Sequence, residues 1–546
     1  MIKKISILSL ILLSSYNLFS QGYFSGDLEL RNDYYVRDTA IGASGTPQYD
    51  YLKSSMDSWL TSNYRNEKWG LNVGMRLDFF VNSNLHAPGS AFTKVKLGRL
   101  FVTKDIGKLS VTAGHFYDQF GSGLAFRAYE DRFLGIDNSI FGIRAKYELT
   151  KNINLKAFGG LRNDRLSENV IGTNGAFIKG INAEGNFKLG EHITITPGVS
   201  AVNRTITKSE MDKIVTSINS YPNFNDRFLP VHNVYVFAAN NTLSYKRISW
   251  FIEGGYKTKE AIQNLDGNLI DRAGNIIYTN LTYSTKGFGI TGQFKRTENF
   301  QFRDSPLTTS SILRGSHNFI APINKQHSSR LAARYAPASQ EIGEVAFSFD
   351  VTKKLGKNFG LQITASEIHT LDVSFKHWAK TLLFRELTAE LDWKASKKVK
   401  GEIGLQFVQY HSEFYEQHKG DANKVFAFTP FAEVSYKFDR TKALRLEAQY
   451  QYTPNDFGQW AFFLAEFSMA PNFTISVSDQ WNIVKGPNDA SRKNVHYPSV
   501  FTSYTIKTTR MFASYVRQVE GIVCTGGVCR LEPAFSGVKI GVNTSF

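Results

Sequence analysis

The stretch WGLNVGMRLDF (Trp69–Phe79) alternates strictly between large apolar residues and small or polar ones. Because successive side chains of a β-strand point to opposite faces, this pattern predicts a strand with one apolar and one polar face. The same alternation recurs in FGIRAKYEL (Phe141–Leu149) and ALRLEAQYQY (Ala443–Tyr452), and similar segments follow one another from Phe24 to the last residue. The chain is therefore expected to be all-β.

The composition agrees with this expectation. Aromatic residues make up 14% of the chain, and they are accompanied by 43 glycines. Aromatic residues favour strands, and glycine favours the turns that join them. The formal charge of +16 favours anionic partners or anionic lipid head groups. The chain has no block of Lys and Arg and no nucleic-acid-binding motif, so nucleic acid is not an expected partner.

The connections between the predicted strands are of two kinds, and the two kinds tend to alternate. The short ones include 66–68, 150–152, 246–247, 285–287, 396–398, 439–442 and 471–472. The long ones fall near 36–50, 80–94, 118–138, 203–230, 259–278, 297–339, 411–423, 482–498 and 518–532. Sandwiches and propellers also alternate along their strands, but tight turns at one end and long loops at the other are typical of transmembrane barrels.

These features predict a transmembrane antiparallel up-and-down β-barrel of about 24 strands in the outer membrane. Long loops are expected outside the cell, and short turns and both termini in the periplasm. Aromatic residues such as Trp69, Trp250 and Trp393 crowd the strand ends, as an interfacial girdle requires. The final strand, SGVKIGVNTSF, ends in Phe546 and resembles the C-terminal signal of outer-membrane barrels.

The N-terminus resembles a signal peptide. Lys3 and Lys4 precede a short apolar run, Ile5–Leu13, and cleavage after Ser20 is expected. The mature chain, 21–546, would then be a single barrel domain. Cys524 and Cys529 are the only cysteines, and in an oxidising compartment they are expected to form a disulfide across a Gly-Gly turn.

The loop FYDQFGSGLAFRAYEDRFLGID (Phe116–Asp137) mixes glycines, charges and large apolar residues. A phosphate cradle would need a following helix, which the pattern does not predict. Two interpretations remain open. Either the loop folds inward and its charges narrow the lumen, or it is a rim loop whose ion pairs hold its shape. The constriction candidates are Arg127, Glu130, Asp131 and Arg132. The apolar content of Ser305–Ser339 likewise predicts an ordered element, one that fills the lumen.

No catalytic, cofactor or metal site is expected. Pairs such as His115 with Asp118 and His369 with Glu367 could be named as catalytic candidates, but these residue types are common in loops. The histidines also lack the spacing of metal ligands. The predicted protein is therefore not an enzyme.

The stretch FYDQFGSGLAFRAYEDRFLGIDNSIFGIR (Phe116–Arg144) and the stretch VCTGGVCRLEPAFSG (Val523–Gly537) together resemble a Bacteroidota family of outer-membrane barrels of unassigned function. The resemblance implies location and fold but no activity. Two functions follow as hypotheses. One is an accessory subunit of an outer-membrane assembly for protein export or barrel assembly, in contact with membrane lipids and with other outer-membrane or surface proteins. The other is a passive channel for small hydrophilic or anionic solutes, suggested by Arg76, Arg144, Lys146 and Arg445 on the predicted lumen face.

Overall fold

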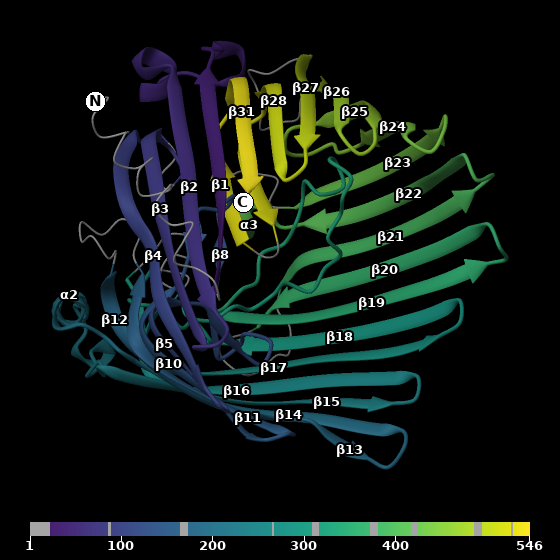
Figure 1. The fold of residues 1–546 in the computed structure, drawn as a ribbon. Helices are drawn as coiled ribbons and strands as arrows, with labels where there is room; N and C mark the ends of the chain where they lie inside the picture. Colours follow the sequence, from purple (N-terminus) through teal and green to yellow (C-terminus); the bar gives the residue numbers. More distant parts are fainter. Residues whose placement is uncertain are drawn as a thin grey trace.

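The computed structural model describes residues 22–546, apart from 86–88, 164–172, 265–266, 308–315, 372–380, 417–423, 485–493 and 526–527. The predicted signal peptide lies outside these residues. The described chain forms one large closed sheet of antiparallel strands (Figure 1). Strand β1 (Gly22–Tyr35) pairs with the last strand, β31 (Phe535–Ser545), and this pairing closes the barrel.

Each strand of the barrel pairs with its neighbour in the chain. The first half consists of β2 (Ser54–Asn66), β3 (Leu71–Ser83), β4 (Phe92–Ile106), β5 (Leu109–Phe116), β10 (Ile140–Thr150), β11 (Ile153–Asn163), β12 (Thr173–Gly185), β13 (Phe187–Leu189), β14 (Ile193–Thr205), β15 (Asn233–Tyr245), β16 (Ile248–Gln263) and β17 (Leu269–Thr285). The second half consists of β18 (Phe288–Glu298), β19 (Gly343–Leu355), β20 (Phe359–Thr370), β21 (Leu382–Lys394), β22 (Val399–Tyr410), β23 (Val425–Lys437), β24 (Lys442–Gln451), β25 (Gln459–Met469), β26 (Phe473–Val484), β27 (Val495–Ile506) and β28 (Thr509–Gln518).

The strand number confirms the prediction. The sheet has 25 strand segments, but β12 and β13 both pair with β14 and occupy one position, which leaves 24 positions. Both ends of the described chain lie at the end of the barrel that carries the short turns. Gly22 is in register with Asn66, next to the β2–β3 turn, and Thr544 is in register with Thr509, next to the β27–β28 turn.

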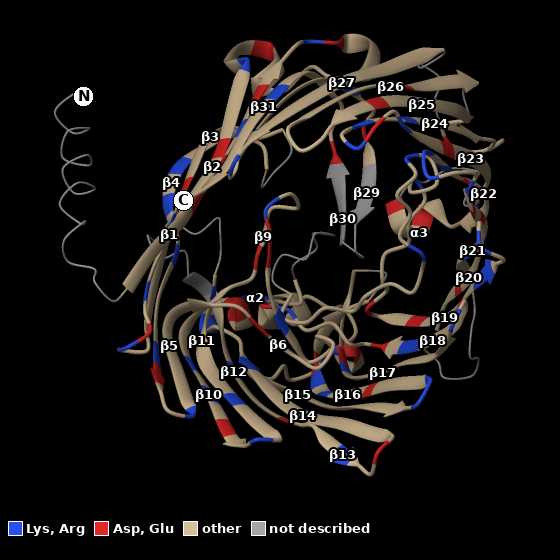
Figure 2. Ribbon diagram, turned by 45° about the vertical axis from the view of Figure 1, so that its right-hand side comes forward, with Lys and Arg blue, Asp and Glu red and all other residues tan. Residues whose placement is uncertain are grey.

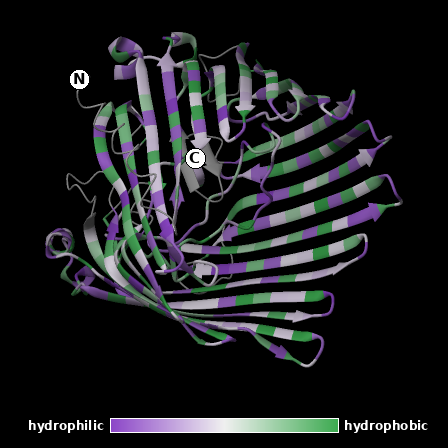
Figure 3. Cartoon of the chain, in the orientation of Figure 1, coloured by the Kyte–Doolittle hydropathy of each residue, from purple (hydrophilic) through white to green (hydrophobic). Residues whose placement is uncertain are grey.

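The predicted faces are also observed. Hydrophilic and hydrophobic residues alternate along the strands (Figure 3), and their exposure separates the two faces. On β3, Met75 and Val81 point outward and are 41% and 39% exposed, whereas Arg76 and Asp78 point inward and are 1% and 5% exposed. Outward-facing residues of the other strands are similarly apolar, as Ile143, at 62% exposure, illustrates. None of the helices in the described part of the chain combines the length and the apolar character needed to span a bilayer.

One predicted loop was wrong. Residues 259–278 were expected to be a long connection, but β16 and β17 pair as far as Gln263 and Leu269, so the connection is only 264–268. Helix α2 (Lys208–Asn219) covers the extension: its Met211, Ile214 and Ile218 form a buried cluster with Ala261 and Leu269. Burial of these apolar side chains stabilises the ends of β16 and β17, which project past the rest of the barrel wall. The pattern also missed three connections: 164–172 between β11 and β12, 371–381 between β20 and β21, and 452–458 between β24 and β25.

Several other connections at the long-loop end carry small elements. They are η2 (Thr39–Ile41), η3 (Gln48–Leu52), β6 (Asp118–Phe120), β7 (Phe126–Ala128), β8 (Glu130–Asp131), β9 (Ile136–Asp137), η4 (Phe224–Asp226), α3 (Ser412–Glu416), β29 (Gly521–Thr525) and β30 (Val528–Glu532). In the hairpin of β29 and β30, Cys524 is the register partner of Cys529. Directly opposed residues of an antiparallel pair have Cα atoms roughly 4.5–5.5 Å apart, which suits a disulfide. The two side chains lie outside the described part, so the disulfide stays a prediction.

Candidate functional site

The loop 117–139 lies inside the barrel, where Figure 2 shows β6 and β9 within the ring of strands. Phe120 and Phe126 are 0% and 1% exposed. Their ring centroids lie 5.6 and 4.4 Å from that of Phe158, on the inner face of β11. Leu124 joins the same buried cluster. The loop therefore folds inward, as the first interpretation expected, and the narrowing of the lumen by its charges stays a prediction.

The glycines of this loop allow its tip to approach the wall closely. Gly121 has a φ of +53°, and a Cβ there would lie 2.4 Å from Glu253 Oε1 and 2.6 Å from Asn240 Nδ2. The backbone N–H of Ser122 donates a hydrogen bond of 2.9 Å to Glu253 Oε2. A side chain at position 121 would therefore push the tip off β15 and β16. The glycines position a loop tip and do not build a phosphate cradle.

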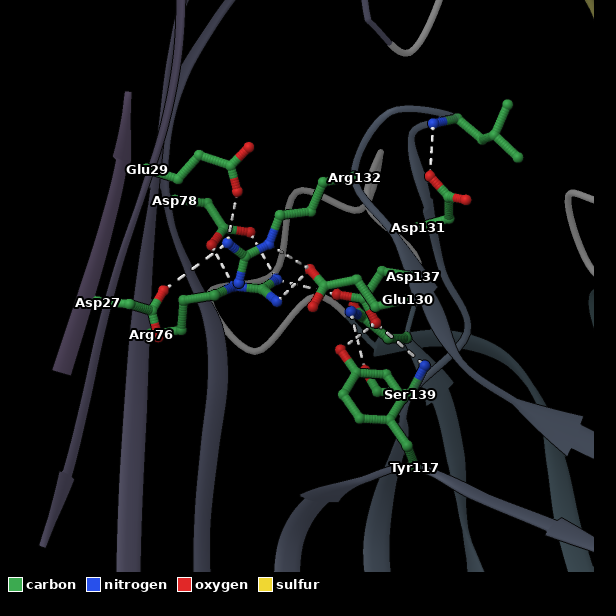
Figure 4. A network of polar contacts seen from close by, with 12 residues as sticks. Asp27, Glu29, Arg76, Asp78, Tyr117, Glu130, Asp131, Arg132, Asp137 and Ser139 are labelled. Atoms are coloured by element: carbon green, nitrogen blue, oxygen red, sulfur yellow. Dashed lines mark hydrogen bonds and ion pairs between the residues drawn. The ribbon is translucent and has the colours of Figure 1, made fainter. Parts of the chain in front are cut away.

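Arg76 joins the wall to this loop (Figure 4). Its guanidinium donates hydrogen bonds to three carboxylates: Asp78 on the same strand, Glu130 in β8 and Asp137 in β9. The shortest distances are 2.5, 2.5 and 2.9 Å, and the Arg76 side chain is 2% exposed. Charge-assisted contacts of this kind are among the stronger hydrogen bonds. The hydroxyl of Tyr117 donates a further bond of 3.0 Å to Asp137 Oδ1.

Arg132 makes a second link between the loop and the wall. Its Nη1 lies 2.8 Å from Glu29 Oε2 on β1, and its Nε lies 3.2 Å from Glu130 Oε1. Its Nη1 also lies 3.8 Å from Asp27. Arg132 and Glu130 are therefore paired ions that hold the loop to β1 and β3.

Arg127 and Asp131 are in different surroundings. The guanidinium of Arg127 lies over the rings of Tyr129 and Phe319, 4.4 and 4.3 Å from their centroids. Asp131 accepts a hydrogen bond of 3.0 Å from the backbone N–H of Leu134, within its own loop. The structure thus brings Glu130 and Arg132 together in one network and places Arg127 and Asp131 outside that network.

A second loop, 299–342, packs against the first. The N–H of Arg127 donates to the carbonyl of His317 at 2.9 Å, and the N–H of Phe319 donates to the carbonyl of Gly123 at 3.0 Å. His317 is 2% exposed, and its Nε2 lies 3.0 Å from Asp304 Oδ1. Burial lowers the pKa of His317, and Asp304 opposes this shift only in part. Burial therefore favours the neutral form of His317.

The loop 299–342 runs along the inside of the barrel from β18 to β26. Near its start, Lys295 on β18 makes a buried ion pair of 2.7 Å with Glu344 on β19 and donates to the carbonyl of Ala321 at 2.6 Å. Farther along, the N–H of Leu331 donates to Gln449 on β24 at 2.6 Å, and Arg330 donates to Gln480 on β26 at 3.2 Å. The expectation that Ser305–Ser339 fills the lumen agrees with these contacts, except for 308–315, which lie outside the described residues.

We call the loops 117–139 and 299–342 together the plug. Several anchors of the plug could not be found from sequence, because their partners are far apart in the chain. Besides Arg76, these include Arg162, which lies 2.5 Å from Asp304, and the buried group of Arg204, Lys257 and Glu260, with distances of 2.5 and 2.6 Å. The only signal in the sequence is a charged residue on the polar face of a strand.

The candidate catalytic residues do not form an active site in the described structure. His115 accepts a hydrogen bond of 3.1 Å from the N–H of Leu100, whereas Asp118 binds Arg144 at 3.3 Å. His369 lies 2.5 Å from Glu367 on the outer face of β20, with Arg385 as a third member at 2.8 Å. Within the described residues, no group of three or more His, Cys, Asp or Glu side chains is placed to hold a metal ion.

A family model matches residues 1–546, the whole sequence. The chain belongs to a family of unknown function, DUF6029. No curated protein matches it. The siderophore receptor PirA from Pseudomonas aeruginosa is similar over 96% of this chain and 80% of its own, with 7% identity and a TM-score of 0.43.

Two other solved structures are also similar to this member of DUF6029. The translocation pore of the P pilus usher PapC is similar over 95% of this chain and 99% of its own, with 9% identity and a TM-score of 0.42. OccAB3 from Acinetobacter baumannii is similar over 72% of this chain and 98% of its own, with 8% identity and a TM-score of 0.33.

Proposed function

We propose that this DUF6029 protein is an integral outer-membrane barrel that serves as an accessory, structural subunit of an outer-membrane assembly for protein export or barrel assembly, without enzymatic activity. The plug is the observation that supports this proposal. It is held on separate parts of the wall by ion pairs such as Arg76–Asp137 and Arg162–Asp304, whose side chains are at most 19% exposed. Separating such buried pairs is costly, so the plug favours a permanently filled barrel.

The proposal includes an orientation. The apolar outward face would contact membrane lipids, and the short turns and both termini would lie in the periplasm. A peptide tag inserted after Lys151, in the β10–β11 turn, should then stay hidden in intact cells. A tag inserted after Leu229, a residue that is 86% exposed in the long β14–β15 loop, should be labelled. Antibody labelling of whole and permeabilised cells tests this, and surface labelling of the turn alone would invert the topology.

A passive channel for small anionic solutes is the second candidate. Lys146 faces the lumen with 42% of its side chain exposed, which favours this candidate. Several arginines on the lumen face, such as Arg76 and Arg445, are neutralised by acids of the wall and the plug. Arg445, for example, lies 3.0, 3.2 and 3.5 Å from Glu433, Glu447 and Glu466. An accessory role therefore has the stronger support.

Deleting Gly121–Arg132, together with the control deletion Asn223–Asp226, distinguishes the two functions. The control removes η4, which buries no residue. If the barrel is an accessory subunit, the intact protein should be silent in planar bilayers and should co-purify with partners from native membranes. The first deletion should then open a conductance and release a partner, whereas the control deletion should do neither. A steady conductance of the intact protein without any partner would instead establish the channel.

A further inference from the structure

A cavity of about 250 Å³ lies on the inner wall where β3, β4, β5 and β10 meet. Four inward residues form a row across these strands: Asn72 is in register with Thr103, Thr103 with Thr112, and Thr112 with Arg144. Arg99, Phe116 and Tyr117 also line the cavity. Because Tyr117 begins the plug loop, the cavity lies between the plug and the short-turn end of the barrel.

Arg99 is the unusual member of this group. Among the described residues its side chain has no hydrogen bond and no ion pair, and its Nε is buried without a partner. Its guanidinium lies 4.4 and 5.2 Å from the ring centroids of Phe101 and Tyr117, which hold it in place. A buried donor of a charged group that lacks an acceptor is costly, so the site is incomplete as it stands.

Arg144 adds to the positive charge of the cavity. Its Nη1 donates to the carbonyl of Tyr117 at 2.8 Å, and its Nη2 donates to Thr112 at 3.1 Å, but its Nε is buried and has no partner within the described chain. Its carboxylate partner, Asp118 at 3.3 Å, is shared with Lys146 at 3.5 Å and Lys156 at 3.4 Å. A single carboxylate therefore faces three cations at this point. Glu184, at 4.0 Å from Lys156, is the next acid.

In the described part of the chain, no acid forms an ion pair with Arg99. Arg76 is its register partner on β3, but the carboxylates of Asp78, Glu130 and Asp137 bind Arg76. The cavity therefore combines two arginines, two threonine hydroxyls and the amide of Asn72. Arginine forks match the oxygens of phosphate, and hydroxyl and amide groups complete such sites.

We propose that this cavity binds a small dianionic oxyanion of the phosphate class, with Arg99 and Arg144 as its principal ligands. The ligand would reach the site from the short-turn end of the lumen, below the plug. Binding there would satisfy the unpartnered guanidinium donors and balance the local excess of positive charge. This inference goes beyond the proposed function, because the site exists whether or not the barrel conducts.

Titration calorimetry with inorganic phosphate on the intact, folded barrel tests the proposal. Chloride at matched ionic strength provides the baseline. Phosphate and sulfate should bind at one site, and acetate should bind more weakly. Arg99→Gln should weaken phosphate binding by about tenfold to hundredfold, because it removes a charge-assisted contact. The matched control, Arg445→Gln, removes a lumen arginine that already has three carboxylate partners and should leave phosphate binding unchanged.

A second measurement uses only the wild-type protein, so it does not depend on the folding of a variant. Phenylglyoxal should modify Arg99, and phosphate should protect Arg99 but not Arg445, as read by mass spectrometry of the peptides. The proposal is overturned if wild-type protein gives no more heat with phosphate than with chloride. Equal binding of acetate and phosphate, equal losses in the two variants, or no protection of Arg99 would also overturn it.

Discussion

Arg76→Leu should release the loop 117–139 from the wall and destabilise the barrel by about 3–5 kcal/mol, because it leaves buried carboxylates without their cation. Asp78 and Asp137 have side chains that are 7% and 1% exposed, so water cannot take the place of the guanidinium without moving the loop. Trypsin should then cleave after Arg127 or Arg132, which the folded loop protects. Loss of the heat-modifiable folded band on gels measures the destabilisation of the barrel. Cleavage after Arg127 or Arg132 measures the release of the loop.

The control for Arg76→Leu is Arg445→Leu, which removes another lumen arginine whose side chain is 32% exposed. Solvent can hydrate the acids around Arg445, so Arg445→Leu should lower the stability of the barrel much less. Adding Asp78→Asn and Asp137→Asn to Arg76→Leu should restore part of the stability, because the uncompensated charges are gone. If Arg76→Leu and Arg445→Leu destabilise equally, or if the added amides rescue nothing, then Arg76 does not anchor the loop electrostatically.

Val477→Arg should destabilise the barrel by about 2–4 kcal/mol, because it places a charge on the lipid face near the middle of a strand. Val477 lies in β26, is 53% exposed on the outer face, and has Ala465 and Val500 as register partners. The matched variant is Ser476→Arg, one residue earlier and on the inner face. Its register partner there is Glu466, which favours an arginine. Ser476→Arg should therefore lower the stability of the barrel only slightly.

Denaturant titrations of both variants in lipid vesicles, followed by the heat-modifiable band, measure the difference. The comparison isolates the face of the strand, because the two substitutions introduce the same side chain at neighbouring positions. Equal losses for the two variants would show that the outer face of β26 does not contact lipid.

The alternating pattern predicted the faces of the strands correctly because a strand repeats every two residues whatever its neighbours are. Arg76, Arg144 and Arg445 were placed on the lumen face by this rule alone. The prediction of a long loop at 259–278 was wrong because the alternation of apolar and polar residues weakens where α2 covers the ends of β16 and β17. At those positions Ala261 and Leu269 are buried by contacts that the local pattern does not contain.

The four constriction candidates of the loop 117–139 also have contacts that the local sequence pattern does not predict. Their charges indicated a functional loop, but nothing local separates Glu130, which binds Arg76 from 54 positions away, from Asp131, which accepts a hydrogen bond from the backbone N–H of Leu134. The partners of an ion depend on where the loop folds, and loop folding depends on apolar packing of Phe120 and Phe126 on the wall.

By itself, the sequence determined an all-β barrel of about 24 strands, its two faces, and its division into a short-turn end and a long-loop end. These properties follow from the period of the strand and from the lengths of the connections, which are local. Only the tertiary structure decided that the loops 117–139 and 299–342 fill the lumen, that Arg76 and Lys295 hold them, and that Arg99 has no acid partner among the described residues. Those outcomes depend on the closure of the barrel, which brings residues from distant strands and loops to one inner wall.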